Sequence, residues 1–146
     1  MNFGGLVRGA SLATVTLVLG LGFGAPAFAD DLEDAVAAAD ATAGAQQFRQ
    51  CSACHTVDEG GANRVGPNLW GVLGRDVGAV DGFRYSRALS GAEDSWSLEA
   101  LDAFIENPRA ARAGTTMGFP GVRNETQRMN VLAYLASLGA SEEDDE

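Results

Sequence analysis

Both cysteines and the only histidine of this 146-residue chain fall within five positions, in the run Cys51-Ser52-Ala53-Cys54-His55. This cluster constrains the fold more than any other feature, because whatever it binds must lie against one short segment. The length of the chain suits a single domain around that segment. The C-x-x-C-H spacing has four interpretations, and the rest of the sequence discriminates among them.

A structural zinc ion needs four protein ligands, so zinc here would require additional carboxylates or a second chain. A redox-active dithiol is expected in a βαβ setting, which the pattern lacks. A disulfide across two residues closes too small a loop to stabilise the protein much. The remaining interpretation is covalent attachment of one c-type haem through Cys51 and Cys54, with His55 bound to the iron.

The second axial ligand of such an iron cannot be another histidine of this chain, because His55 is the only one. A methionine thioether is the usual high-potential alternative. Met117 lies in the glycine-bracketed run GTTMGFPG, whereas Met129 falls inside an expected helix, where packing is the ordinary role. We expect Met117 to be the ligand; an open sixth position is the competing possibility.

The N-terminal segment has the pattern of an export signal. No charge occurs between Arg8 and Asp30, and Ala27-Phe28-Ala29 is an A-x-A cleavage pattern. Residues 1–29 are therefore expected to be a signal peptide and the domain to be periplasmic. An uncleaved membrane anchor is the alternative, since 21 uncharged residues could span a bilayer.

Acidic residues are concentrated at the two ends of the remaining chain. Residues 30–42 and 140–146 hold ten of the 20 acids and are expected to be solvated, disordered tails around a domain at 43–139. Residues 41–141 have ten acids and nine arginines, so the net charge of −10 mostly describes the tails. Without a basic cluster, a nucleic-acid partner is not expected.

The hydrophobic pattern predicts an all-α fold with long loops. A first helix is expected from about Asp40 to Cys54, with Asp40 or Thr42 as its N-cap. Another is expected after Ser97 as N-cap, ending at Asn107-Pro108, and a last one is capped by Asn124 and stopped by Gly139. Between Thr56 and Tyr85 seven glycines and Pro67 interrupt any helical period. So long a segment without helices suggests a loop wrapped around a ligand.

Six runs of residues, in this order, resemble the class I cytochromes c, and most closely the bacterial relatives of mitochondrial cytochrome c. They are CSACHTV, GPNLWGVLGR, GFRYSRAL, W…IENP, GTTMGFPG and VLAYLASL, which lie between Cys51 and Leu138. The resemblance as a whole covers roughly residues 43 to 138. The resemblance implies a fold in which N- and C-terminal helices cross and long loops wrap one covalently bound haem.

The resemblance also implies roles for individual residues around the haem. Pro67 would accept a hydrogen bond from the His55 ring, and Arg75 and Thr115 would lie near the propionates. Tyr85 and Trp96 would donate to a propionate, and Phe119 would lie beside the methionine loop near the exposed haem edge. Gly44, Phe48 and Tyr134 match positions where the terminal helices cross.

This chain departs from the family pattern at several positions. Phe104 stands where many relatives have tyrosine, Leu89 replaces a commonly polar residue, Ala113 replaces a proline at the start of the methionine loop, and Thr116 replaces a lysine. The chain has no lysine at all, so the lysine ring that mitochondrial-type cytochromes use for docking is absent.

The expected function is that of a monomeric one-electron carrier rather than an enzyme, with no small-molecule substrate. Its partners would be membrane redox complexes or soluble periplasmic oxidases and reductases of respiratory or photosynthetic chains. A small peroxidase is the competing class, but the sequence offers no second histidine and no acid–base pair for it.

Overall fold

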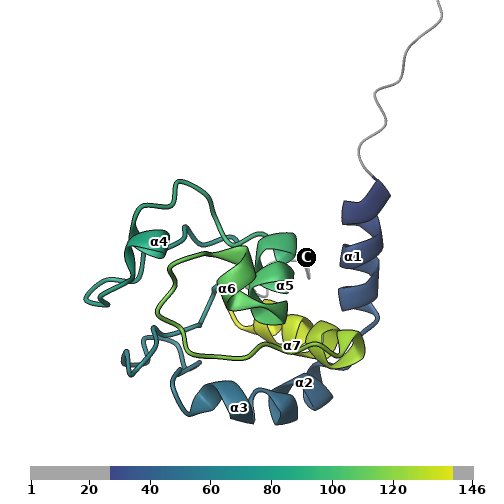
Figure 1. Ribbon diagram of the computed structural model, residues 1–146. Coiled ribbons are helices and arrows are strands. Elements are labelled where there is room, and N and C mark those ends of the chain that lie inside the picture. Colours follow the sequence, from purple (N-terminus) through teal and green to yellow (C-terminus); the bar gives the residue numbers. More distant parts are fainter. Residues whose placement is uncertain (1–26, 140–146) are drawn as a thin grey trace, which may run out of the picture.

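The computed structural model describes residues 27–139 and confirms the all-α prediction. Within these residues no β-strand forms, and an isolated bridge joins Asp76 to Ser95. Figure 1 shows α1, α2 and α5 around α7, with α4 and the long connecting loops on the side away from α1. The helices are α1 (Ala27–Ala37), α2 (Ala41–Gln47), α3 (Arg49–Ser52), α4 (Arg87–Ser90), α5 (Leu98–Glu106), α6 (Pro108–Ala111) and α7 (Glu125–Ser137).

Helices α2 and α7 cross closely, as the sequence predicts for the first and last helices of the domain (Figure 1). A Cβ atom at Gly44 would lie 1.9 Å from the carbonyl oxygen of Asn130 in α7, so only glycine allows this approach. The rings of Phe48 and Tyr134 pack beside it, with centroids 5.4 Å apart. This crossing fixes the position of α2 relative to α7.

The expected single helix from Asp40 to Cys54 is wrong in its length. Asp40 does cap α2, accepting bonds from the backbone N–H groups of Thr42 and Ala43 at 2.8 and 3.0 Å. The helix breaks at Phe48, whose carbonyl accepts from the backbone N–H groups of both Cys51 and Ser52. The Phe48 ring at this break belongs to the core and is 4% exposed.

Helices α5 and α7 begin where the sequence predicts. The Ser97 hydroxyl accepts from the Ala100 N–H at 3.2 Å, and the Asn124 side chain accepts from the Gln127 N–H at 2.9 Å. The buried faces of α5 and α7 meet in the core, and their members are Leu101, Phe104 and Ile105 from α5 and Met129, Val131, Leu132 and Leu135 from α7. Both helices therefore present apolar side chains to the centre of the molecule.

The segment between α3 and α4 contains no helix, in agreement with its glycine content. Glycine is required where the backbone must turn against another segment. At Gly78, φ is +79° and a Cβ atom would lie 2.6 Å from the carbonyl oxygen of Leu89. Such turns let the chain curve around the interior without regular secondary structure.

The prediction of a disordered acidic tail at residues 30–42 is wrong. Residues 27–37 form α1, which contacts α7 and α5, and Asp40 is the N-cap of α2. Leu32, Val36 and Ala39 recur at helical spacing and pack against the core, with Val36 only 6% exposed. A single apolar stripe thus orders a segment whose other side chains are exposed acids and alanines.

The predicted signal peptide falls on residues 1–29 and the acidic C-terminal tail on 140–146. Apart from the first residues of α1, both lie outside the described residues. Within residues 27–139, no helix combines the length and the apolar character that crossing a membrane requires.

Candidate functional site

A cavity of about 190 Å³ lies between α3, α5, α7 and the loops. Its lining is mostly apolar and comes from both ends of the domain, from Phe48 to Leu135. All ten residues that the sequence analysis singled out as candidates line it: Cys51, Cys54, His55, Pro67, Arg75, Tyr85, Trp96, Thr115, Met117 and Phe119. Cys51 and Met117, which are 66 positions apart in the chain, therefore line the same cavity.

The imidazole of His55 is held in one orientation by the backbone. Its Nδ1 lies 2.7 Å from the carbonyl oxygen of Pro67, and because a carbonyl only accepts, Nδ1 carries the proton. Nε2 is then the unprotonated nitrogen that can bind a metal. Burial lowers the pKa of His55, an effect that the bond to Pro67 partly offsets.

Gly66 leaves just enough room for this ring. A Cβ atom at Gly66 would lie 2.2 Å from Cε1 of His55, so any larger residue would displace the imidazole.

The neighbouring Val65 is 78% exposed, which is unusual for a large apolar side chain and places an apolar surface at the edge of the cavity.

Cys51 and Cys54 are both free thiols, half-buried in the wall of the same cavity. Burial, with a smaller contribution from Cys54, raises the pKa of the Cys51 thiol to about 11. A reactive dithiol needs the opposite shift, toward thiolate at neutral pH. Among residues 27–139, no group of three or more His, Cys, Asp and Glu side chains is placed to hold a metal ion. The geometry thus favours neither the dithiol nor the zinc interpretation.

Met117 lies in the segment of residues 113–123, which we call the Met117 loop. Its side chain is half-buried and lines the cavity, and its backbone N–H donates to Thr115 Oγ1 at 3.3 Å. Met129 instead packs in the core of α7, 7% exposed, and is not among the cavity residues. Of the two methionines in the described part of the chain, only Met117 faces the space beside His55.

Arg75 brings a positive charge to the cavity wall without a carboxylate beside it. Its guanidinium donates to the carbonyl oxygens of Trp70 and Asn68, at 2.9 and 3.0 Å. The two ion pairs found among residues 27–139 do not include it. Burial lowers the pKa of Arg75 and raises that of the adjacent Tyr85. A half-buried cation and a phenol in this place suit a ligand that carries acidic groups.

Aromatic side chains form much of the apolar wall. Trp96 is 8% exposed and packs on Phe104 with ring centroids 5.0 Å apart. Phe119 is half-buried in the Met117 loop, and Phe83 packs edge-on against Tyr85 at 4.8 Å. These flat surfaces suit a flat apolar ligand.

The sequence analysis missed Ser86. It occupies the N-cap position of α4, but its hydroxyl caps nothing. The Oγ atom is buried, has no hydrogen-bond partner in the protein, and Ser86 lines the cavity. An unpaired buried hydroxyl costs about 1–3 kcal/mol, so a polar group of a ligand is its natural partner. The signal in the sequence was a serine directly after Tyr85, at the N-cap position of α4.

Together these residues fit a haem with its two acidic side chains. Two thiols, an imidazole with Nε2 available and a thioether line an apolar cavity, and Arg75, Tyr85 and Ser86 supply polar atoms. Comparison with known proteins points the same way, because the model of the family described as Cytochrome c matches residues 41–139. The chain belongs to the cytochrome c family.

Relatives of this cytochrome include bacterial proteins. It is 42% identical over 118 residues to a cytochrome c homolog of Bradyrhizobium diazoefficiens, which covers 80% of this chain and 64% of that protein. It is 42% identical over 100 residues to a cytochrome c2 of Rhodoplanes tepidamans, covering 68% of this chain and 94% of the relative. The chain thus spans just under two thirds of the length of the Bradyrhizobium protein.

A solved structure is similar as well. Cytochrome cH from Methylobacterium extorquens superimposes with a TM-score of 0.62 at 36% identity, over 66% of this chain and 97% of the other. The fold is therefore that of a class I cytochrome c, as the resemblance implied. The cofactor of this family is one covalently bound haem c, and Cys51-Ser52-Ala53-Cys54-His55 fits its attachment motif.

Proposed function

We propose that this cytochrome is a one-electron carrier whose haem iron is bound by His55 and Met117. The observation that carries the proposal is the convergence of these two side chains, with both thiols, on one cavity. The bound haem supplies the redox chemistry, since its iron accepts and returns one electron. A carrier works best when little rearranges with each transfer, and two ligands that stay bound in both oxidation states provide that.

The residues of the chain divide the remaining tasks. Cys51 and Cys54 would anchor the cofactor covalently, and the bond to Pro67 would keep Nε2 of His55 available to bind the iron. A thioether ligand and an apolar wall both favour the reduced state and raise the reduction potential. Arg75, Tyr85, Trp96, Thr115 and the additional Ser86 are proposed to hold the propionates, with Phe119 beside the haem edge.

Partners would dock briefly over the exposed edge of the cofactor. Val65, which is 78% exposed beside the cavity, gives this edge an apolar contact, and weak redox encounters need only a small patch. We propose a monomer that acts in the periplasm between membrane redox complexes or soluble oxidases and reductases. Mass spectrometry of the mature protein tests export, because a chain that begins at Asp30 has lost the first 29 residues.

The ligand assignment is tested by absorption spectra of the ferric protein and two variants. Met117→Ala is expected to lose the sulfur-to-iron charge-transfer band and to become high-spin. Met129→Leu is the matched control: it replaces the core methionine by an isosteric residue, at a cost below about 1.5 kcal/mol, and should keep the band. An unchanged spectrum in Met117→Ala would refute the proposal.

A further inference from the structure

The two ion pairs found among residues 27–139 hold the two ends of the Met117 loop. Arg112, which directly precedes the loop, pairs with Asp94. Arg128, in the first turns of α7, pairs with Asp102 and also contacts Val122 near the end of the loop. The two pairs differ in exposure, and this difference has a consequence for the iron ligand between them.

The C-terminal end of the loop is fixed by buried contacts. The N–H of Val122 donates to the carbonyl of Ile105 at 2.9 Å, and its own carbonyl accepts from Arg128 Nη1 at 3.1 Å. Arg128 Nε lies 2.5 Å from Asp102 Oδ1, and the Arg128 side chain is only 9% exposed. Salt screens such a shielded pair weakly.

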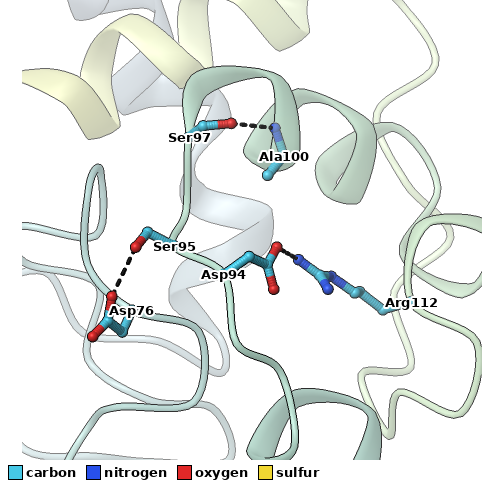
Figure 2. A network of polar contacts seen from close by, with 6 residues as sticks. All are labelled: Asp76, Asp94, Ser95, Ser97, Ala100 and Arg112. Atoms are coloured by element: carbon cyan, nitrogen blue, oxygen red, sulfur yellow. Dashed lines mark hydrogen bonds and ion pairs between the residues drawn. The ribbon is translucent and has the colours of Figure 1, made fainter.

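The N-terminal end is held by contacts that reach the surface. One Arg112 nitrogen pairs with the carboxylate of Asp94 (Figure 2). The guanidinium carbon of Arg112 also lies 5.6 Å from the centre of the Trp96 ring. The side chains of Arg112 and Asp94 are 22% and 50% exposed. A cation over an aromatic face adds attraction, but the ion pair itself is open to solvent and therefore to salt.

Asp94 is a rigid anchor point. Its carbonyl accepts from the Val77 N–H at 2.9 Å, and the Trp96 N–H donates to the Arg75 carbonyl at 2.9 Å. Figure 2 shows the adjacent bond from the Ser95 hydroxyl to the Asp76 carboxylate, which measures 2.7 Å. Arg112 therefore ties the start of the loop to the same short ladder that carries Trp96 in the cavity wall.

Few contacts restrain the middle of the loop. The Thr115 N–H donates to the Arg112 carbonyl at 3.0 Å and the Met117 N–H to Thr115 Oγ1 at 3.3 Å, both local bonds. Gly118 has no heavy atom within 4 Å of its ideal Cβ position. Apart from the packing of the Met117 and Phe119 side chains against the core, the loop is therefore held to other segments mainly at its two ends.

We propose that Arg112 is a positioning residue for Met117, and that the Arg112–Asp94 pair is a salt-sensitive latch on the start of the ligand loop. The loop opens from this end while the Arg128 end stays closed. The inference rests on the proposed function, because it takes Met117 as the iron ligand. It assigns the control of ligand release to a side chain that does not line the cavity.

The test is the rate at which imidazole replaces Met117 in the ferric holoprotein. At a pH where imidazole is neutral, salt does not steer it to the protein, so its association rate reports loop opening. Exposed ion pairs of this kind change an equilibrium by roughly two- to five-fold. We expect the wild-type rate to rise by that factor from low to high salt. Arg112→Gln should be as fast at low salt as wild type at high salt, without further salt dependence.

Two matched variants sharpen this test. Arg112→Lys keeps the charge and should retain most of the salt dependence with a slower rate than Arg112→Gln. Arg109→Gln removes an exposed arginine of α6 that is in neither of the ion pairs and should follow wild type. Urea unfolding curves measured in parallel separate loop opening from global unfolding. Only a local opening has a rate that does not depend on urea at low concentration.

The outcomes distinguish the latch from the ligand assignment. If Met117→Ala leaves the ferric spectrum unchanged, the proposed function fails and the latch fails with it. If Met117→Ala changes the spectrum but Arg112→Gln reacts with imidazole at the wild-type rate, or keeps the wild-type salt dependence, the latch alone is refuted. Acceleration by Arg109→Gln equal to that by Arg112→Gln would also overturn it.

Discussion

At the residue scale, the position of His55 depends on backbone atoms and on a missing side chain. Pro67 supplies a carbonyl oxygen and Gly66 supplies space. The sequence alone could indicate the candidate site because the chain has so few candidates: counting its single histidine and its methionines leaves almost no alternative. Ser86 could not be found that way, because serine is common and only its burial without a partner distinguishes it.

Gly66→Ala should disturb His55 directly. The added Cβ atom would lie 2.2 Å from Cε1 of the ring, so either the imidazole or the backbone must shift. We expect a lower free energy of unfolding by roughly 1–3 kcal/mol, together with a changed ferric spectrum. Gly91→Ala is the control: it lies outside the cavity lining and its nearest heavy atom would be 3.2 Å away. Equal effects of the two variants would contradict this reading of Gly66.

At the element scale, long helices with capping side chains were predictable and short ones were not. Asp40, Ser97 and Asn124 act as N-caps in the structure as the sequence suggests. Helices α4 and α6 have four residues each, too few to show a hydrophobic period. The sequence predicts a tail over α1 because the segment is rich in acidic residues. Its stripe of apolar residues becomes informative only once α5 and α7 lie beside it.

Gly44→Ala separates helix propensity from helix packing. In an isolated helix the change gains roughly 1 kcal/mol. Here the Cβ atom would lie 1.9 Å from the Asn130 carbonyl oxygen, so we expect instead a loss of about 1–3 kcal/mol in urea unfolding. Thr42→Ala, on an exposed position of the same helix, should be neutral or slightly stabilising. A stabilised Gly44→Ala protein would show that α2 and α7 are not in close contact.

Val36→Asp should detach α1 and leave the rest of the fold in place. Val36 is 6% exposed, and a buried unpaired carboxylate costs more than one short helix gains by docking. Hydrogen exchange should then lose protection in residues 30–39 while α7 keeps it. Ala37→Asp adds the same charge on an exposed position and should not detach the helix. Loss of protection throughout α7 would mean that α1 is integral to the core.

At the scale of the whole molecule, loops distant in sequence hold each other through charged groups. Asp94 and Arg112 are 18 positions apart, and no pattern in either segment predicts their meeting. Their pairing depends on the path of the chain around the cavity, which follows from the cofactor and the glycine turns together. Hydrophobic periodicity and residue propensities in a single sequence do not predict an ion pair between such distant segments.

Asp94→Asn should change how stability depends on pH. The hydrogen bond from Arg112 holds the pKa of Asp94 below its ordinary value of 3.8. A lowered pKa in the folded state contributes stability that is present above that ordinary value and is lost as pH falls through the folded one. The free energy of unfolding of the wild type should therefore exceed that of Asp94→Asn near neutral pH, and the difference should shrink in acid. Urea unfolding at several pH values measures it; a difference independent of pH would contradict the assignment.

The cavity wall extends from Phe48 near the start of the domain to Leu135 in its last helix. A chain that crosses a membrane N-terminus first delivers Cys51 and Cys54 early and α7 last. Until α7 arrives, the wall is incomplete and both thiols stay within reach of whatever attaches the cofactor. Under the proposed export, the fold would leave an interval during translocation in which attachment is easiest, and docking of α7 on α2 would end it.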